Sequence, residues 1–194
     1  MEMSRLFVIF LSAMLVNNFV LSRFLGICPF LGVSRKLDTA TGMSLAVIFV
    51  MTVASVITWF LNQLLLLMDI PFMRTIVFIL VIATLVQFIE ILLKKVSPSL
   101  YEALGIYLPL ITTNCAILGL AILNVQQEYT LMETIFHSIG AGAGFAIALI
   151  IFATIRERMD LYEMPESFKG LAGALVTAGL LSMSFMGFQG LVRL

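Results

Sequence analysis

The chain contains two cysteines, and each one opens the same short motif, C-x-x-L-G. Cys28 begins the first copy and Cys115 the second, so each half of the 194-residue sequence holds one copy. Thiolates bind iron and copper(I), and a 2Fe–2S cluster takes four cysteines or close substitutes. The repeated motif therefore suggests half of a metal or redox site, completed by a partner. Free cysteines also serve as small apolar packing residues, and the residues alone leave that alternative open.

Polar side chains accompany both cysteines. Asn17 and Asn18 lie before the first motif, and Thr113 and Asn114 lie directly before the second. Such groups can hydrogen-bond cluster sulfurs or line an ion path through a membrane. They can equally join helices or satisfy a broken backbone, and the sequence does not decide between these roles.

Two further features predict packing more than chemistry. His137 is the single histidine, and we interpret it as a structural residue of an apolar segment. Gly140 and Gly144 form a G-x-x-x-G face, which is typical of helices that pack closely in membranes.

The composition identifies the class of protein. Hydrophobic residues make up 61% of the chain and charged residues 11%, with a mean hydropathy of +1.13. A soluble domain carries about twice that charged fraction, so the sequence predicts an integral membrane protein. The formal net charge is zero and no basic block is present, which argues against nucleic acid as a partner.

Charge-free runs predict six transmembrane helices in an all-α fold. The runs cover residues 6–34 (with Arg23 inside), 39–68, 75–93 (with Glu90 near its end), 103–127, 134–155 and 170–192. We expect a single membrane domain over residues 1–194, with one repeat at about 1–96 and another at about 97–194. Because three spans are an odd number, the second repeat would enter the membrane inverted.

The cysteine-bearing spans are predicted to be broken. The first run exceeds one straight crossing of a bilayer core of roughly 30 Å. Helix-breaking residues occur in both the first and the fourth run, namely Gly26, Pro29, Gly32, Gly105, Pro109 and Gly119. Broken helices in corresponding spans predict free backbone groups around a buried site.

Basic residues predict the orientation. Connections one, three and five contain Arg35, Lys36, Lys94, Lys95, Arg156, Arg158 and Lys169. The opposite side has only Arg5, Arg74 and Arg193. Basic loops stay in the cytoplasm, so both termini should be extracytoplasmic.

Longer stretches around the cysteines resemble a known family. They are Val16-Asn-Asn-Phe19, Phe24-Leu-Gly-Ile-Cys-Pro-Phe-Leu-Gly32 and Leu108-Pro-Leu-Ile-Thr-Thr-Asn-Cys115, with Ile155-Arg-Glu-Arg158, Thr177-Ala-Gly-Leu180 and Phe185-Met-Gly-Phe188 further on. They are similar to the A subunits of Rnf ion-translocating oxidoreductase complexes. The E subunits of sodium-pumping NADH:quinone reductases share the same plan.

The resemblance implies two inverted three-helix repeats in the inner membrane of a bacterial or archaeal cell. It implies a homologous E subunit of opposite topology as partner, with two cysteines from each subunit holding one 2Fe–2S cluster. The ligands from this chain would be Cys28 and Cys115. The other Rnf subunits (B, C, D and G) would be further partners, with ferredoxin as an indirect one. Flavin and NAD would bind only to other subunits of the complex.

From these observations we expect a membrane subunit of a redox-driven ion pump that carries electrons and couples their transfer to movement of Na⁺ or H⁺. Such a subunit has no stand-alone active site, and its remaining partner is membrane lipid. Two alternatives stay open: a small inverted-repeat secondary transporter, and a structural assembly subunit without a cofactor.

Overall fold

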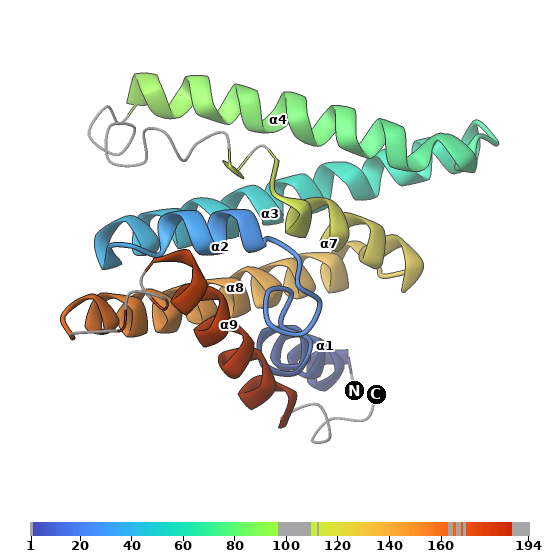
Figure 1. Ribbon diagram of the computed structural model, residues 1–194. Coiled ribbons are helices and arrows are strands. Elements are labelled where there is room, and N and C mark those ends of the chain that lie inside the picture. Colours follow the sequence, from blue (N-terminus) through green and yellow to red (C-terminus); the bar gives the residue numbers. More distant parts are fainter. Residues whose placement is uncertain are drawn as a thin grey trace.

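Two long helices, one from each half of the chain, form the centre of the molecule. Helix α3 covers Leu37–Leu67 and helix α8 covers Leu131–Asp160. They lie side by side and run in opposite directions (Figure 1). Apolar side chains of both helices are completely buried, including Met43, Val47, Ala141, Phe145 and Ala148.

The computed structural model describes residues 2–96, 110–111, 113–162, 165, 168 and 170–187, and these residues contain helices and turns but no strand. The other elements are α1 (Glu2–Leu11), a π-helical turn (Ser12–Val16), α2 (Ile27–Val33), a 3₁₀ turn (Pro71–Met73), α4 (Arg74–Val96), α7 (Cys115–Gln126) and α9 (Leu171–Met186). The prediction of an all-helical membrane protein is confirmed.

Three helical stretches of the described chain are long and apolar enough to cross a membrane: Leu37–Leu67, Pro71–Leu92 and Leu131–Asp160. Three shorter apolar helices, Met3–Val16, Cys115–Gln126 and Leu171–Met186, coincide with the other predicted spans. Residues 103–109, the first part of the predicted fourth span, lie outside the described residues, as do residues 188–192 at the end of the sixth. The count of six spans and the inversion of the repeats stay predictions.

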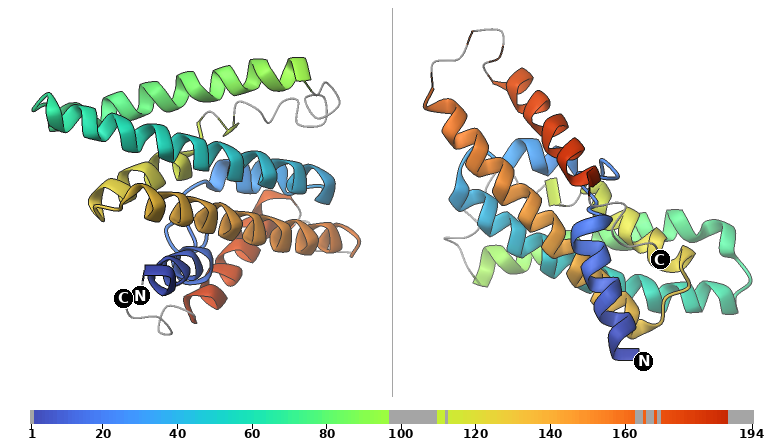
Figure 2. Two further views of the ribbon diagram at one scale, coloured as in Figure 1. Left: turned by 180° about the vertical axis from the view of Figure 1, so that it is seen from behind. Right: turned by 90° about the horizontal axis from the view of Figure 1, so that it is seen from below.

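The predicted break near Cys28 is present. Regular helix ends at the π-helical turn, and residues 17–26 form a non-helical segment, here called the cysteine loop, before α2 begins. Helices α2 and α7 both begin near the middle of the molecule and run toward opposite ends (Figures 1 and 2). The chain thus places two short helices, one from each half, with their first residues facing the same region.

Close packing along the glycines of α8 fixes α1 in place. A methyl group added at Gly140 would lie 2.7 Å from the carbonyl oxygen of Phe10, and one at Gly144 would lie 2.7 Å from that of Met14. Backbone atoms cannot move aside as flexible side chains do, so only glycine permits this approach. The prediction of a closely packed glycine face is confirmed.

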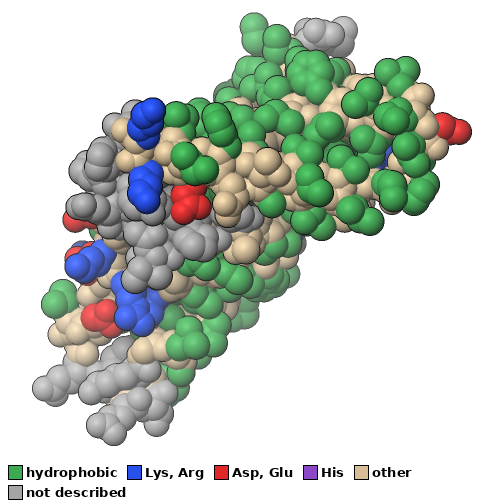
Figure 3. All heavy atoms as spheres, turned by 90° about the horizontal axis from the view of Figure 1, so that it is seen from above, with side chains coloured by type: hydrophobic (Ala, Val, Ile, Leu, Met, Phe, Trp, Pro, Cys, Tyr) green, Lys and Arg blue, Asp and Glu red, His purple; other side chains and the backbone are tan. Residues whose placement is uncertain are grey.

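Charged side chains gather at one end of the molecule (Figure 3). The start of α3 and the ends of α4 and α8 lie at that end (Figure 1), and these elements carry or adjoin Arg35, Lys36, Lys94, Lys95 and Arg158. Hydrophobic side chains cover much of the remaining surface in the same view. This distribution is that of a protein whose sides face lipid and whose basic end faces water.

Candidate metal half-site

Each cysteine lies in the first turn of a short helix. Cys28 is the second residue of α2, which follows Gly26 in a left-handed conformation with φ of +80°. Cys115 is the first residue of α7. Asn114 caps that helix, because its side chain accepts a hydrogen bond from the backbone N–H of Ala116 at 3.0 Å. Local backbone chemistry therefore sets where each helix begins, and hence where each thiol is presented.

The two motifs contact each other directly. The backbone N–H of Gly26 donates a hydrogen bond to Sγ of Cys115, with N and S 2.9 Å apart. A methyl group added at Gly26 would lie 3.0 Å from Oδ1 of Asn114 and 3.2 Å from Cβ of Ala116. The backbone just before Cys28 thus packs against the first turn of the helix that carries Cys115.

The glycines that end the motifs complete the contact. Methyl groups added there would meet leucines of the opposite half, at 2.7 Å for Gly119 with Leu25 and 3.2 Å for Gly32 with Leu110. Each of these leucines lies shortly before the cysteine of the other motif. The C-x-x-L-G pattern is therefore explained by reciprocal packing, in which each glycine admits the segment that leads into the opposite cysteine.

Both cysteines are exposed and neither forms a disulfide. Exposure is unusual for cysteines that serve only as packing residues, which are among the most buried of side chains. Within the described part of the chain, no cluster of three or more histidine, cysteine or acidic residues could hold a metal on its own. Two soft thiol ligands with an open side fit half of the ligand set of a 2Fe–2S cluster.

The predicted polar residues fall into distinct positions. Asn18 is buried, and its amide nitrogen donates to the carbonyl oxygen of Gly144 at 2.7 Å. Its oxygen accepts from the N–H groups of Val20 and Leu21, which holds the turn of the cysteine loop. Asn114 caps α7, as described above, while Asn17 bonds Ser12 at 3.2 Å. Thr113 is exposed beside Asn114.

Helix α9 also holds the cysteine loop. Oγ of Ser182, a buried residue, donates to the carbonyl oxygen of Leu21 at 2.5 Å. Phe24 has φ of +56°, a conformation that is costly for a bulky side chain and persists only where the surroundings hold it. The loop that presents Cys28 is therefore fixed from α8 and from α9.

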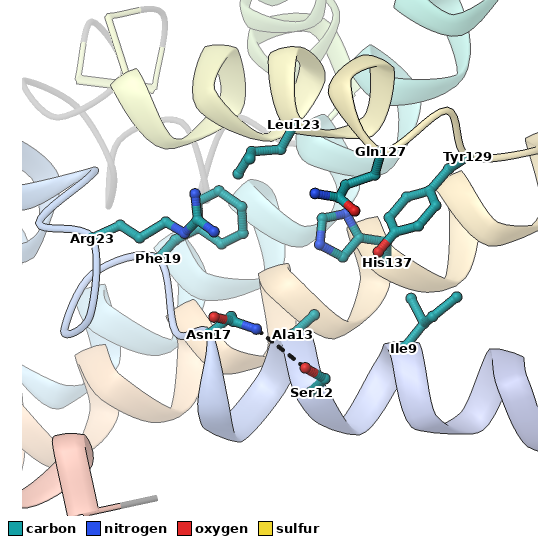
Figure 4. A pocket seen from close by; sticks show the side chains of 10 residues that line it. All are labelled: Ile9, Ser12, Ala13, Asn17, Phe19, Arg23, Leu123, Gln127, Tyr129 and His137. Atoms are coloured by element: carbon teal, nitrogen blue, oxygen red, sulfur yellow. Dashed lines mark hydrogen bonds between the residues drawn. The ribbon is translucent and has the colours of Figure 1, made fainter. Parts of the chain in front are cut away.

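A polar cavity of about 220 Å³ lies beside the cysteine loop (Figure 4). Its polar lining consists of Ser12, Asn17, Arg23, Gln127, Tyr129 and His137. Asn17 and the π-helical turn form one wall, and such turns often occur at functional sites. Burial raises the pKa of the Tyr129 phenol, and the carboxylate of Glu133 raises it further.

His137 has two roles in the structure. Its Nδ1 lies 2.5 Å from Oδ1 of Asn124, and its ring packs edge-on against Tyr129. This is the structural role that the sequence predicts. The ring also lines the cavity, which the sequence does not predict, because the cavity forms between segments more than one hundred residues apart.

Comparison with known proteins supports the same class. Residues 6–192 match the family model described as Rnf-Nqr subunit, membrane protein. The A subunit of the ion-translocating oxidoreductase complex of Syntrophotalea carbinolica is 56% identical over 191 residues, covering 98% of this chain and 99% of its own length. The A subunit of the Na(+)-translocating ferredoxin:NAD(+) oxidoreductase complex of Acetobacterium woodii is 55% identical over 184 residues, covering 94% and 96%. The corresponding protein of Photorhabdus laumondii is 53% identical over 192 residues, covering 98% and 100%.

The fold is that of an all-helical membrane protein, with two exposed cysteines at the starts of short helices whose motifs are in contact. The chain belongs to the Rnf-Nqr family of membrane subunits. The predicted resemblance to the A subunits of ion-translocating oxidoreductases is confirmed.

Proposed function

We propose that this chain is an electron-carrying membrane subunit of an Rnf ion-translocating oxidoreductase complex. Cys28 and Cys115 would supply two of the four ligands of a 2Fe–2S cluster, and a homologous E subunit would supply the other two. The observation that carries the proposal is the hydrogen bond from Gly26 N–H to Sγ of Cys115, which joins the two cysteine motifs of the chain at one site.

The backbone around Cys115 is suited to hold a cluster sulfur. The N–H of Gly26 donates to Cys115, and hydrogen bonds to cluster sulfurs tune the reduction potential. Cys115 also begins a helix of twelve residues, whose N-terminal end carries partial positive charge. When bound, such a cluster accepts and releases single electrons. The residues of this chain hold the sulfurs at fixed positions and leave one side open to a partner.

Several features support two inverted three-helix repeats. The central helices α3 and α8 come from corresponding places in the two halves and run antiparallel (Figure 1). The cysteine-bearing helices α2 and α7 run in opposite directions, and the motif glycines pack reciprocally. With the basic end in the cytoplasm, both termini would be extracytoplasmic.

We propose that the complex couples electron transfer between ferredoxin and NAD to movement of Na⁺ or H⁺. The name of the Acetobacterium woodii relative specifies sodium, ferredoxin and NAD for that protein. Flavin and NAD would bind other subunits of the complex. For this chain, Asn17 and Thr113 are the better candidates for an ion path, because both are exposed whereas Asn18 and Asn114 are buried.

The proposal is tested by iron content and electron paramagnetic resonance of this subunit purified anaerobically with its homologous partner. Wild type is compared with Cys28→Ser, Cys115→Ser and the corresponding alanine variants. Thr41→Ala, a substitution at an exposed threonine of α3, controls for loss of the cluster during purification of a variant. We expect a reduced 2Fe–2S signal in wild type and control, and its loss in every cysteine variant while the pair stays assembled.

An assembled wild-type pair without iron would overturn the proposal. Solute flux through this chain without partners, unaffected by the cysteine variants, would identify a secondary transporter. Loss of the whole complex on deletion, with dispensable cysteines, would identify an assembly subunit.

A further inference from the structure

A second polar cavity, of about 470 Å³, lies where α3 passes into α4. The lining comes from the end of α3, the first residue of α4 and the end of α7 with the turn that follows it. This end of the molecule is opposite the basic end, whereas α2 and α7, whose first turns carry the cysteines, begin near the middle of the molecule (Figure 1). Neither the proposed cluster nor the proposed electron transfer uses this cavity.

The cavity is lined by buried polar groups that lack protein partners. Oδ1 of Asn62, Nδ2 of Asn124 and Nε of Arg74 are buried without a hydrogen-bond partner. Asn62 is 8% exposed and Asn124 is 4% exposed. Asn124 bonds His137 through its oxygen, so its nitrogen is the end left unpaired. Buried polar groups are almost always satisfied, so these three atoms form a polar wall that the protein itself leaves unsatisfied. Each has almost no accessible surface, so a ligand in the cavity bonds them only when their side chains turn toward it.

The charges around the cavity match a zwitterion. Arg74 and Glu128 both line it, yet no ion pair joins them in the described structure. Glu128 has φ of +52°, a left-handed conformation that is unfavourable for glutamate but is present in this fold. A cation and an anion that share a cavity without contact leave room for a ligand carrying both opposite charges.

The location indicates a lipid. Side chains around the α3–α4 turn are apolar and largely exposed, among them Phe60, Leu64, Leu67, Phe72 and Ile76. Figure 3 shows hydrophobic side chains along this face of the molecule. Trp59 donates its indole N–H to the carbonyl oxygen of Tyr129, and both aromatic residues line the cavity. Tryptophan and tyrosine are enriched at the level of lipid headgroups.

We infer that this cavity binds the headgroup of a phospholipid that carries a primary amine, such as phosphatidylethanolamine. The phosphate accepts hydrogen bonds from the guanidinium group of Arg74, and from Nδ2 of Asn124 once that amide turns toward the cavity. The ammonium group donates to the carboxylate of Glu128, and to Oδ1 of Asn62 once that amide turns toward the cavity. Arginine suits the phosphate because it offers several fixed donors, and the acyl chains follow the exposed apolar side chains of the turn. The inference is independent of the cluster.

The test measures lipid bound to the intact complex. The delipidated complex is exchanged into nanodiscs of phosphatidylcholine that contain a minor fraction of phosphatidylethanolamine or of phosphatidylglycerol, and retained lipid is quantified by native mass spectrometry. Variants are Arg74→Gln, Arg74→Lys and Glu128→Gln. Arg35→Gln, at an exposed arginine of the opposite end, and Asp69→Asn, at an acidic residue outside the cavity, are the matched controls.

We expect wild type and both controls to retain phosphatidylethanolamine over phosphatidylcholine. Arg74→Gln should lower retention about tenfold, the effect of losing one charge-assisted contact, and Arg74→Lys should restore part of it. Glu128→Gln should abolish the preference for the amine while phosphate binding persists. Equal retention by wild type and Arg74→Gln in assembled complexes would overturn the inference. So would full displacement of the lipid by inorganic phosphate, which would identify a free-anion site.

Discussion

The backbone N–H of Gly26 and the sulfur of Cys115 are joined by a hydrogen bond of 2.9 Å, although 89 residues separate them in the chain. Gly26 can make this bond because its φ of +80° turns the chain directly before α2 and brings its backbone against the start of α7. One glycine thus sets both the start of the helix that carries Cys28 and the electrostatic surroundings of Cys115.

Replacing Gly26 by alanine should therefore affect stability and the cluster together. The left-handed conformation alone costs a non-glycine residue about 1–2 kcal/mol. The new methyl group would also lie 3.0 Å from Asn114 and 3.1 Å from Phe145. We expect a lower thermal unfolding midpoint of the purified complex and a changed electron paramagnetic resonance signal.

Gly170 offers a control with positive φ but without a packing contact. Its φ is +79° and its ψ −129°, and nothing lies within 4 Å of a methyl group added there. Gly170→Ala also introduces backbone strain, so it should lower the unfolding midpoint while it leaves the cluster signal unchanged. An equal change of the cluster signal in the two variants would show that contact between the motifs is unimportant.

Asn114 should act on α7 as a helix cap. Asn114→Ala removes the acceptor for the N–H of Ala116 and should cost about 1 kcal/mol. Asn114→Ser should restore most of this stability, because serine caps well and because the amide nitrogen of Asn114 has no partner to lose. The measurement is thermal unfolding together with iron retained per complex. A serine variant no better than alanine would exclude capping as the role.

The two adjacent asparagines should respond differently to substitution. Asn18 is 1% exposed and bonds three backbone groups, so Asn18→Ala should destabilise the subunit by about 1–3 kcal/mol. Asn17 is exposed and makes one bond to Ser12, so Asn17→Ala should stay within about 0.5 kcal/mol. Thermal unfolding of the two variants provides the comparison, and similar losses would contradict it.

If Asn17 lines an ion path, its alanine variant should alter the sodium or pH dependence of turnover without a loss of stability. The assay is ferredoxin-dependent NAD reduction by the reconstituted complex at varied Na⁺ concentration. An unchanged ion dependence in Asn17→Ala combined with Thr113→Ala would remove both residues from the path.

The sequence predicts the features that depend on composition and on local backbone chemistry. The apolar runs predict the long helices, and the glycines near Cys28 predict a broken helix. A proline is expected to interrupt a helix at its own position, but the break does not lie at Pro29. Pro29 lies inside the first turn of α2, where its missing N–H is not needed, and the non-helical segment comes before it.

Features that depend on contacts between distant segments could not be predicted. Asn18 is fixed by the carbonyl oxygen of Gly144, and Asn62, Arg74 and Asn124 meet at one cavity although three different helices supply them. No local pattern identifies such partners. The motif C-x-x-L-G indicates that its glycine matters, but the reason becomes visible only where Gly119 receives Leu25 from the other half.

The glycine face of α8 gives the sharpest prediction about packing. A methyl group at Gly144 would lie 2.7 Å from the carbonyl oxygen of Met14 and 3.3 Å from that of Ala13, so α1 and its π-helical turn would have to move. Overpacking of this kind costs about 1–3 kcal/mol. Because Gly144 also accepts the hydrogen bond from Asn18, the displacement should reach the cysteine loop. Gly144→Ala should therefore lower both the thermal unfolding midpoint and the iron retained.

Gly179→Ala, where nothing lies within 4 Å, should be neutral or stabilising, since alanine favours helix by up to about 1 kcal/mol over glycine. A destabilised Gly144→Ala that retains all its iron would show that α1 and the cysteine loop are not coupled.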